Sequence, residues 1–133
     1  MTHQVLFVCP HGAAKSVLAA AYFNQLASRN GLAYQARSAG TEPDDQVNPL
    51  VVDLLHGEGI DVSSQRPRRL TTGDLARAEY VITMGCDLSE VTSGAKVLDW
   101  SHIPAVSDNS AAAAQIIRQH VEALIDSLRV DPS

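Results

Sequence analysis

Short apolar runs and helically spaced apolar positions alternate along the chain. Val5 to Val8 is an unbroken apolar run, which is typical of a strand buried on both faces of a sheet. Glu79 to Met84 and Lys96 to Trp100 are also rich in apolar residues, and they predict two further strands. A fourth strand is predicted over Ala33 to Ala39, where polar side chains indicate a position at the edge of the sheet.

Between these strands the apolar spacing becomes helical. Lys15 to Asn30 predicts a helix that stops at Gly31. Asn48-Pro49 predicts the start of a second, short helix, with the asparagine as its N-cap. A long third helix is predicted over Ser110 to Leu128. The residues expected to face the core are Val17, Leu18, Ala21, Tyr22 and Leu26 in the first helix and Ile117, Val121, Leu124 and Leu128 in the last.

Alternation of strands and helices predicts an α/β fold with a parallel sheet, because parallel strands need crossover connections between them. The 133 residues are enough for one hydrophobic core. We therefore expect a single domain over residues 1–133.

Composition and charge narrow the classes of partner. The chain has 15 acidic and 10 basic residues, a formal net charge of −5 and no basic run, which argues against nucleic-acid binding. No apolar run approaches the roughly 18 residues of a membrane span, and the first residues lack the basic start of a signal peptide. Two cysteines are too few for a disulfide scaffold. We therefore expect a cytoplasmic protein with reduced thiols and no membrane association.

The first predicted strand ends at Cys9, and the loop after it leads into a helix. In open α/β sheets, ligands bind beyond the carboxyl ends of the strands, and helix N-termini attract anions. Thiols in such positions have pKa values of roughly 3.5–7.5 instead of about 8.5. We therefore expect Cys9 to ionise readily, Lys15 to add a positive charge and Ser16 to donate a hydrogen bond to the sulfur. The expected anion-binding residues are Pro10, His11, Gly12, Ala13, Ala14 and Lys15.

A second interpretation fits the same pattern. Cysteine is often a small buried apolar residue at the end of a strand, and one cysteine before a helix does not define a site. His11 either contacts the anion or points into solvent. Cys9, Pro10 and His11 are too sparse for a metal site, so we expect no metal and no bound cofactor.

The segment "VLFVC-x5-K-S", which ends at Ser16, resembles the anion loop of the low-molecular-weight tyrosine phosphatase superfamily, whose pattern is C-x5-R-S/T after a strand. Later segments resemble the arsenate reductase branch of that superfamily, in its order. They are "SAGTEP" (38–43), "VNP" (47–49), "GIDVSSQRP" (59–67), "YVITMGC" (80–86) and "LDW" (98–100). The resemblance implies a three-layer sandwich: a four-stranded parallel sheet of order 2-1-3-4 with helices on both faces. It also implies that Cys9 is a nucleophile.

Three positions depart from the family pattern. Lys15 replaces the arginine, whose planar fork of donors holds an oxyanion better than a point charge does. Gly12 replaces an asparagine expected in a left-handed turn, which glycine adopts at no steric cost. Ile103 precedes Pro104 where the family has its general acid, an aspartate before a proline. His102 and Asp108 are candidates to replace that acid; the alternative is that both are solvated loop residues.

Cys86 resembles the resolving cysteine of thioredoxin-linked arsenate reductases. The resemblance implies that Cys86 attacks Cys9 after the arsenic adduct forms, giving arsenite and a disulfide. The family's third cysteine corresponds to Ser93, so an external thiol or a redoxin would complete the cycle. The alternative is that Cys86 is an inert thiol at a strand end.

Three functions remain open from the sequence. The first is an arsenate reductase-like enzyme with Cys9, Lys15, Ser16 and Cys86 as catalytic residues. The second is a phosphatase of small phosphoesters, and the third is a non-catalytic relative that binds an oxyanion or a protein partner. A basic cluster is expected to be a solvated loop or a docking point for an acidic redoxin, and it comprises Arg66, Arg68 and Arg69.

Overall fold

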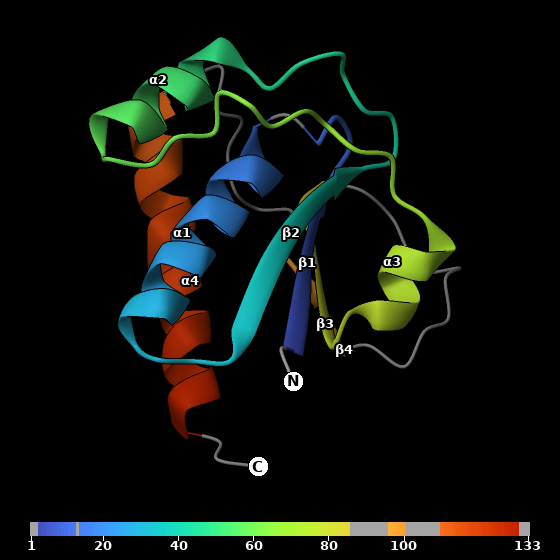
Figure 1. Ribbon diagram of the computed structural model, residues 1–133. Helices are drawn as coiled ribbons and strands as arrows, with labels where there is room; N and C mark the ends of the chain where they lie inside the picture. Colours follow the sequence, from blue (N-terminus) through green and yellow to red (C-terminus); the bar gives the residue numbers. More distant parts are fainter. Residues whose placement is uncertain (1–2, 13, 86–95, 101–109, 131–133) are drawn as a thin grey trace.

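Figure 1 shows the computed structural model of the chain, which describes residues 3–12, 14–85, 96–100 and 110–130. The strands are β1 (His3–Cys9), β2 (Tyr34–Gly40), β3 (Tyr80–Thr83) and β4 (Lys96–Asp99). The helices are α1 (Lys15–Arg29), α2 (Pro49–Gly57), α3 (Thr72–Arg77) and α4 (Ser110–Val130).

The four strands form one sheet in the order β2-β1-β3-β4, and every neighbouring pair is parallel. This confirms the predicted sheet and the predicted edge position of β2. The chain passes from β1 to β2 on one side and returns to β3 on the other side, so the strand order reverses at β1. Ligands of open α/β sheets bind at such a reversal, beyond the carboxyl ends of the strands.

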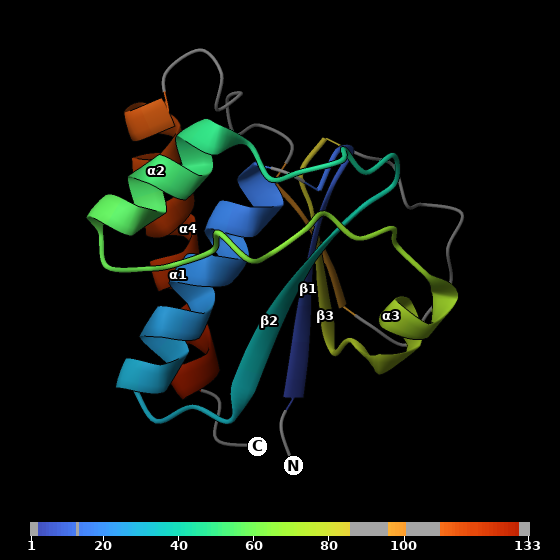
Figure 2. The same ribbon diagram turned by 45° about the horizontal axis from the view of Figure 1, so that its top comes forward.

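Helices cover both faces of the sheet, as predicted (Figure 2). α1, α2 and α4 lie on one face, and the short α3 lies on the other. Side chains of β1 alternate between these faces, because successive side chains of a strand point in opposite directions. Val5, Phe7 and Cys9 belong to the large core with α1 and α4, whereas Leu6 and Val8 belong to a smaller core beside α3.

Helix α1 is buried more widely than its apolar pattern predicts. Ala19, Ala20 and Phe23 are buried in addition to the predicted positions, while Ala21 and Leu26 are only partly buried. The reason is that α1 contacts α4 as well as β1 and β2, so two sides of the helix face the core.

The apolar spacing of α4 is confirmed. The four residues predicted to face the core are all buried, and they are Ile117, Val121, Leu124 and Leu128. The opposite side of α4 is polar, with an ion pair between Arg118 and Glu122. Within the described part of the chain, no helix is long and apolar enough to cross a membrane.

The predicted helix ends are present. The Asn48 side chain accepts a hydrogen bond from the backbone N–H of Leu50 at 2.9 Å, which caps α2, and Pro49 is the first residue of that helix. Gly31 follows the end of α1 with a φ of +65°, a left-handed conformation that other residues rarely adopt.

Helix α3 was not predicted, because its six residues are too few for an apolar period. Thr71 and Asp74 form a capping box in which each side chain bonds the backbone N–H of the other residue. The Asp74 side chain is only 2% exposed and also contacts Arg68 at 2.8 Å and Arg77 at 3.5 Å. Burial raises the pKa of Asp74, but hydrogen bonds from Thr71 and the two guanidinium groups outweigh it, and the pKa lies below the ordinary value.

Replacing Asp74 by Asn should lower the free energy of unfolding near pH 7 by about 1–2 kcal/mol, because the cap and both ion pairs weaken. A depressed folded-state pKa means that the carboxylate stabilises the fold above its unfolded pKa of about 3.9. That contribution disappears as the pH falls through the folded value. Urea unfolding of both proteins from about pH 7 down to pH 3 should therefore show a difference in the free energy of unfolding that becomes smaller toward pH 3.

Asp53→Asn is the matched control, because Asp53 is an exposed carboxylate on α2. It should change the free energy of unfolding by less than about 0.5 kcal/mol. The proposed role of the carboxylate would be contradicted if the free energies of unfolding of Asp74→Asn and the unmodified chain differed by the same amount at every pH.

Candidate functional site

Cys9 is the last residue of β1 and points toward α1. It shares the face of Phe7, since the two side chains are two residues apart in the strand. Its sulfur lies 3.1 Å from the hydroxyl oxygen of Ser16, within hydrogen-bond distance, and either atom can be the donor. Ser16 is completely buried and Cys9 is 5% exposed. The contact between sulfur and hydroxyl that the sequence predicts is therefore present.

The N-terminus of α1 faces the same loop. Lys15 is the first residue of the helix and is half-buried, and Ala14 is its N-cap. An alanine offers no side-chain acceptor, and the first turn contains no acidic residue. The first N–H groups of a helix have no partner within the helix and carry a partial positive charge. This end of α1 therefore leaves donors and positive potential at the loop.

Backbone hydrogen bonds fix the orientation of the loop. The carbonyl of Pro10 accepts from the N–H of Glu42 at 2.7 Å, and that of His11 accepts from the N–H of Asp44 at 3.0 Å. In a trans peptide the carbonyl and the following N–H point in opposite directions. The N–H groups of His11 and Gly12 therefore point away from the segment 42–44. Successive N–H groups that point the same way form an anion-binding concavity.

Two glycines let the loop approach the end of β2. Gly12 has a φ of +60°, as expected for the left-handed turn. A Cβ added to Gly12 would lie 2.9 Å from the nitrogen of Gly40, and one added to Gly40 would lie 2.7 Å from the nitrogen of Gly12. Neither position accepts a side chain without moving the backbone. Gly40 was not singled out from the sequence, although a glycine at a strand end signals close backbone approach.

The His11 side chain contacts the segment after β2. Its Nδ1 lies 3.2 Å from a carboxylate oxygen of Asp44, and both side chains are more than half exposed. The imidazole therefore pairs with the neighbouring loop at the protein surface.

The end of β3 lies beside the loop. The N–H of Met84 donates to the carbonyl of Val8 at 2.8 Å, which extends the pairing of β1 and β3. A Cβ added to Gly85 would lie 3.9 Å from the Cδ of Pro10. The chain therefore reaches residue 85 next to the residue that follows Cys9. Other sequence-predicted residues lie outside the described residues: Ala13, Cys86, Ser93, His102, Ile103 and Asp108.

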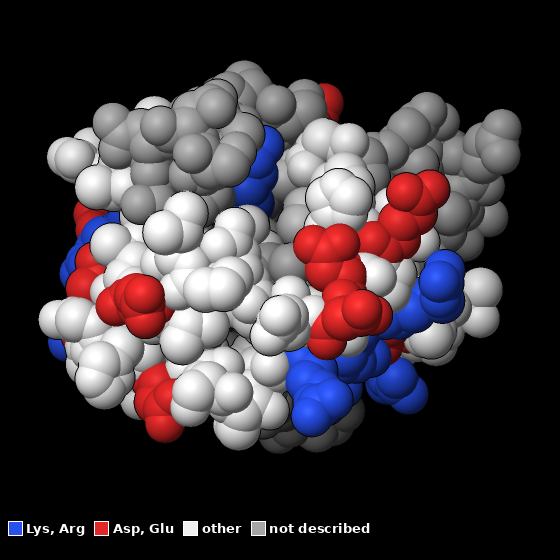
Figure 3. All heavy atoms as spheres, turned by 90° about the horizontal axis from the view of Figure 1, so that it is seen from above, with Lys and Arg blue, Asp and Glu red and all other residues white. Residues whose placement is uncertain are grey.

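Charges of both signs surround this end of the molecule. Figure 3 looks onto the carboxyl ends of the strands and shows acidic and basic groups close to each other. The acidic side chains Glu42, Asp44 and Asp45 are exposed on the segment after β2. Arg69 donates to the carbonyl of Thr41 at 3.2 Å, which ties the basic segment to the acidic one. Attraction of an anion therefore depends on the local donors of the loop.

Metal binding has no support among the residues that the structure describes. No group of three or more His, Cys, Asp or Glu side chains there could hold a metal ion.

Comparison with known proteins places this chain in a family. Residues 4–95 match the family described as low molecular weight phosphotyrosine protein phosphatase. A Halobacterium salinarum protein named "Putative arsenate reductase" is 33% identical over 98 residues, which cover 71% of this chain and 69% of that protein.

Solved structures share the fold. The thioredoxin-dependent arsenate reductase Cg_ArsC1' of Corynebacterium glutamicum superposes with a TM-score of 0.85 at 32% identity, over 97% of this chain and 63% of that chain. This chain therefore spans less than two thirds of the length of that reductase. The low molecular weight protein tyrosine phosphatase of T. tengcongensis superposes with a TM-score of 0.81 at 21% identity, over 95% of this chain and 99% of that chain. The match of residues 4–95 and the 33% identical relative show that the chain belongs to the low molecular weight phosphotyrosine protein phosphatase family.

Proposed function

We propose that this chain is an oxyanion-processing enzyme of the arsenate reductase type, with Cys9 as its nucleophile. The observation that carries the proposal is the 3.1 Å contact between the Cys9 sulfur and the buried Ser16 hydroxyl at the N-terminus of α1. A hydroxyl that donates to a sulfur favours the thiolate, which is the nucleophilic form of cysteine. The relatives named as arsenate reductases, at 33% and 32% identity, support arsenate as the substrate.

The substrate oxyanion would lie against the loop from Pro10 to Lys15. The N–H groups of His11 and Gly12 and the uncapped start of α1 would donate hydrogen bonds to its oxygens. Lys15 would supply a full positive charge. The small side chains of Ala13 and Ala14 would leave the backbone accessible.

The reaction requires two thiols for each arsenate. The Cys9 thiolate attacks arsenic(V), an oxygen leaves as water after protonation, and a sulfur–arsenic bond forms. Cys86 then attacks the Cys9 sulfur, and the electron pair of the sulfur–arsenic bond stays on arsenic, which leaves as arsenite. Two thiols are thereby oxidised to one disulfide while arsenic(V) is reduced to arsenic(III). An external thiol or a redoxin reduces the disulfide, and no bound cofactor is needed.

Cys86 is proposed as the second thiol because Gly85 lies beside Pro10. Thiol attack requires the two sulfurs to meet, and a disulfide needs Cα atoms about 4.4–6.8 Å apart. A redoxin partner is supported by the thioredoxin-dependent relative. We further propose that residues 1–133 form one domain and that the protein works in the cytoplasm, where reductants keep thiols reduced.

Phosphoester hydrolysis is the second candidate, because the Cys9–Ser16 pair and the loop donors would serve a phosphate as well as an arsenate. Hydrolysis needs one thiol and a general acid for the leaving oxygen. His102 and Asp108 are the candidates for that acid. Without an efficient acid the rate should be lower by about 10²–10⁴.

Cys9→Ser should abolish arsenite formation and any aryl phosphate hydrolysis, because the alkoxide is not available at neutral pH. Ser16→Ala should reduce either activity by about tenfold, the effect of one hydrogen bond to a charged group. Steady-state assays with arsenate, excess dithiol and thioredoxin would measure the first activity, and release of an aryl alcohol would measure the second.

Ser28→Ala, on the exposed end of α1, is the control. Equal activity of Cys9→Ser and the unmodified chain would refute the nucleophile, and no reaction by any of them would favour a binding protein.

Cys86→Ser separates the two candidate reactions. Arsenite formation consumes a second thiol and hydrolysis does not, so the ratio of reductase to phosphatase activity should fall by about 100-fold, the loss of an efficient intramolecular attack. The same assays give this ratio, and a mass difference of two hydrogens after arsenate treatment reports the disulfide. An unchanged ratio would exclude Cys86 as the resolving thiol.

Lys15→Arg combined with Ile103→Asp tests whether the loop is intact but weakly catalytic. Arginine supplies paired donors and the aspartate supplies an acid, so aryl phosphate hydrolysis should rise by at least about 10²-fold. Each single variant should give a smaller gain. No gain from the double variant would indicate that the loop does not hold a phosphate in a reactive position.

A further inference from the structure

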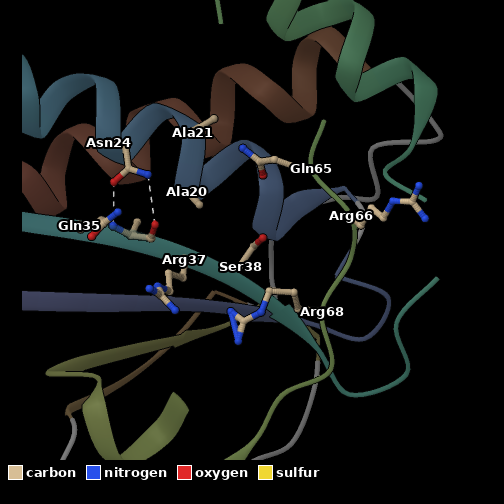
Figure 4. Close-up of a pocket in the computed structure, with 10 residues that line it drawn as sticks. Ala20, Ala21, Asn24, Gln35, Arg37, Ser38, Gln65, Arg66 and Arg68 are labelled. Carbon is tan, nitrogen blue, oxygen red and sulfur yellow. Dashed lines mark hydrogen bonds between the residues drawn. The ribbon is translucent and has the colours of Figure 1, made fainter. Parts of the chain in front are cut away.

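A cavity opens along the outer edge of β2, away from the loop after β1 (Figure 4). Its volume is about 450 Å³, within the range of about 300–1,000 Å³ that small-molecule sites occupy. α1, β2 and the segment 65–68 line it, and it shares no lining residue with the loop 9–16. Its lining contains three arginines and no Asp or Glu. The cavity therefore offers positive charge and hydrogen-bond donors to a ligand.

Two of the arginines converge. Figure 4 shows Arg37 and Arg68 on the same side of β2, with the guanidinium of Arg68 directed toward Arg37, while that of Arg66 turns away. Within the described ranges, the Arg37 side chain makes neither a hydrogen bond nor an ion pair, while its backbone belongs to the pairing of β2 with β1. Arg68 uses one nitrogen to contact Asp74 at 2.8 Å, and the same carboxylate oxygen also contacts Arg77. One carboxylate is therefore shared by two guanidinium groups, and Arg37 adds a further positive charge at a cavity whose lining has no acidic residue.

The edge of β2 also presents backbone groups. Ala36 exchanges two hydrogen bonds with the amide side chain of Asn24, at 2.7 and 3.1 Å. Gly40 donates to the carbonyl of Arg68 and accepts from the N–H of Leu70. Every second residue of a parallel strand directs its backbone groups to the same side. The N–H and C=O of Ser38, midway between Ala36 and Gly40, therefore face outward, and no described residue pairs with them there.

This arrangement excludes an added peptide strand. Strand addition requires main-chain hydrogen bonds along several residues of a free edge. Asn24 occupies the edge at Ala36, and the segment after Arg68 occupies it at Gly40. Between Ala36 and Gly40, Ser38 is the one residue left open by the part of the chain that the structure describes, which suits a compact molecule.

We propose that this cavity binds a small dianion that carries hydroxyl groups, such as a hydroxylated organic phosphate or a hydroxycarboxylate. The oxyanion contacts the guanidinium groups of Arg37 and Arg68 and the N–H of Ser38, since arginine forks match phosphate and carboxylate geometry. A ligand hydroxyl donates to the outward carbonyl of Ser38. Gln35 and Gln65, which also line the cavity, provide further donors and acceptors for hydroxyls. This site is independent of the chemistry proposed for Cys9.

The test is a nuclear magnetic resonance titration of the full chain with glycerol 3-phosphate and with malate, using glycerol as the uncharged reference. The work uses the Cys9→Ser protein so that hydrolysis cannot interfere. Binding should shift the backbone amide signal of Ser38 and the side-chain Nε–H signal of Arg37. A response to glycerol 3-phosphate alone assigns a phosphate ligand, a response to malate alone assigns a carboxylate, and either supports the site.

Arg37→Gln should weaken the binding by about tenfold, because a charge-assisted contact is lost. Arg29→Gln is the matched control: it removes the same charge from the exposed end of α1 and should change the affinity by less than about twofold. Dispersed amide spectra show that both variants fold.

Three results would overturn the proposal. The first is the absence of any shift at Ser38 and Arg37 with either probe up to about 10 mM. The second is a response confined to Gly12 and its neighbours, which would place the anion at the loop after β1. The third is equal weakening by Arg37→Gln and Arg29→Gln, which would indicate attraction to overall charge. The first and third results do not bear on the role proposed for Cys9, whereas the second would support anion binding at the loop beside it. Loss of the Cys9 role would leave the cavity unaffected.

Discussion

The close contact between the backbones of Gly12 and Gly40 is the constraint on which the loop depends. One glycine belongs to the loop after β1, and the other ends β2, so the contact joins two parts of the chain that are far apart in sequence. It brings the carbonyls of Pro10 and His11 within reach of the N–H groups of Glu42 and Asp44. The loop orientation is therefore set by backbone atoms. Side chains at this point can vary as long as both glycines remain.

The contact also connects the loop after β1 to the segment 68–70 and, through it, to α3. Gly40 pairs with the segment 68–70, which carries the basic residues, and that segment is joined to α3 through Arg68 and Asp74. The loop after β1 is thus supported from both faces of the sheet: by the large core that contains Cys9 and by the small core beside α3. The buried carboxylate of Asp74, which caps α3 and pairs with Arg68, stabilises the support on the α3 side.

Local patterns predicted much of this fold. Apolar runs, helical spacing and capping residues predicted the four strands and three of the four helices that the structure describes. Each of these signals lies within a single segment of the chain. Strand order came from the resemblance. α3 has too few residues for a period, and its signal was the spacing of Thr71 and Asp74. The wider burial of α1 could not be predicted, since the sequence does not say that α4 covers the residues beside Ala19.

For the site, the contact between Cys9 and Ser16 followed from local geometry, whereas Gly40 and the cavity beside β2 depend on contacts between distant segments. The roles of Cys86, His102 and Asp108 stay predictions.

The pairing of Asn24 with Ala36 has a consequence for how copies of this protein behave in a crowded solution. An outer strand with free N–H and C=O groups is a template on which another chain can polymerise. Here the side-chain amide of Asn24, on the adjacent helix α1, takes the place of a neighbouring strand. It hydrogen-bonds both the N–H and the C=O of Ala36. The sheet therefore terminates chemically at this point, and intermolecular growth from β2 into aggregates is suppressed.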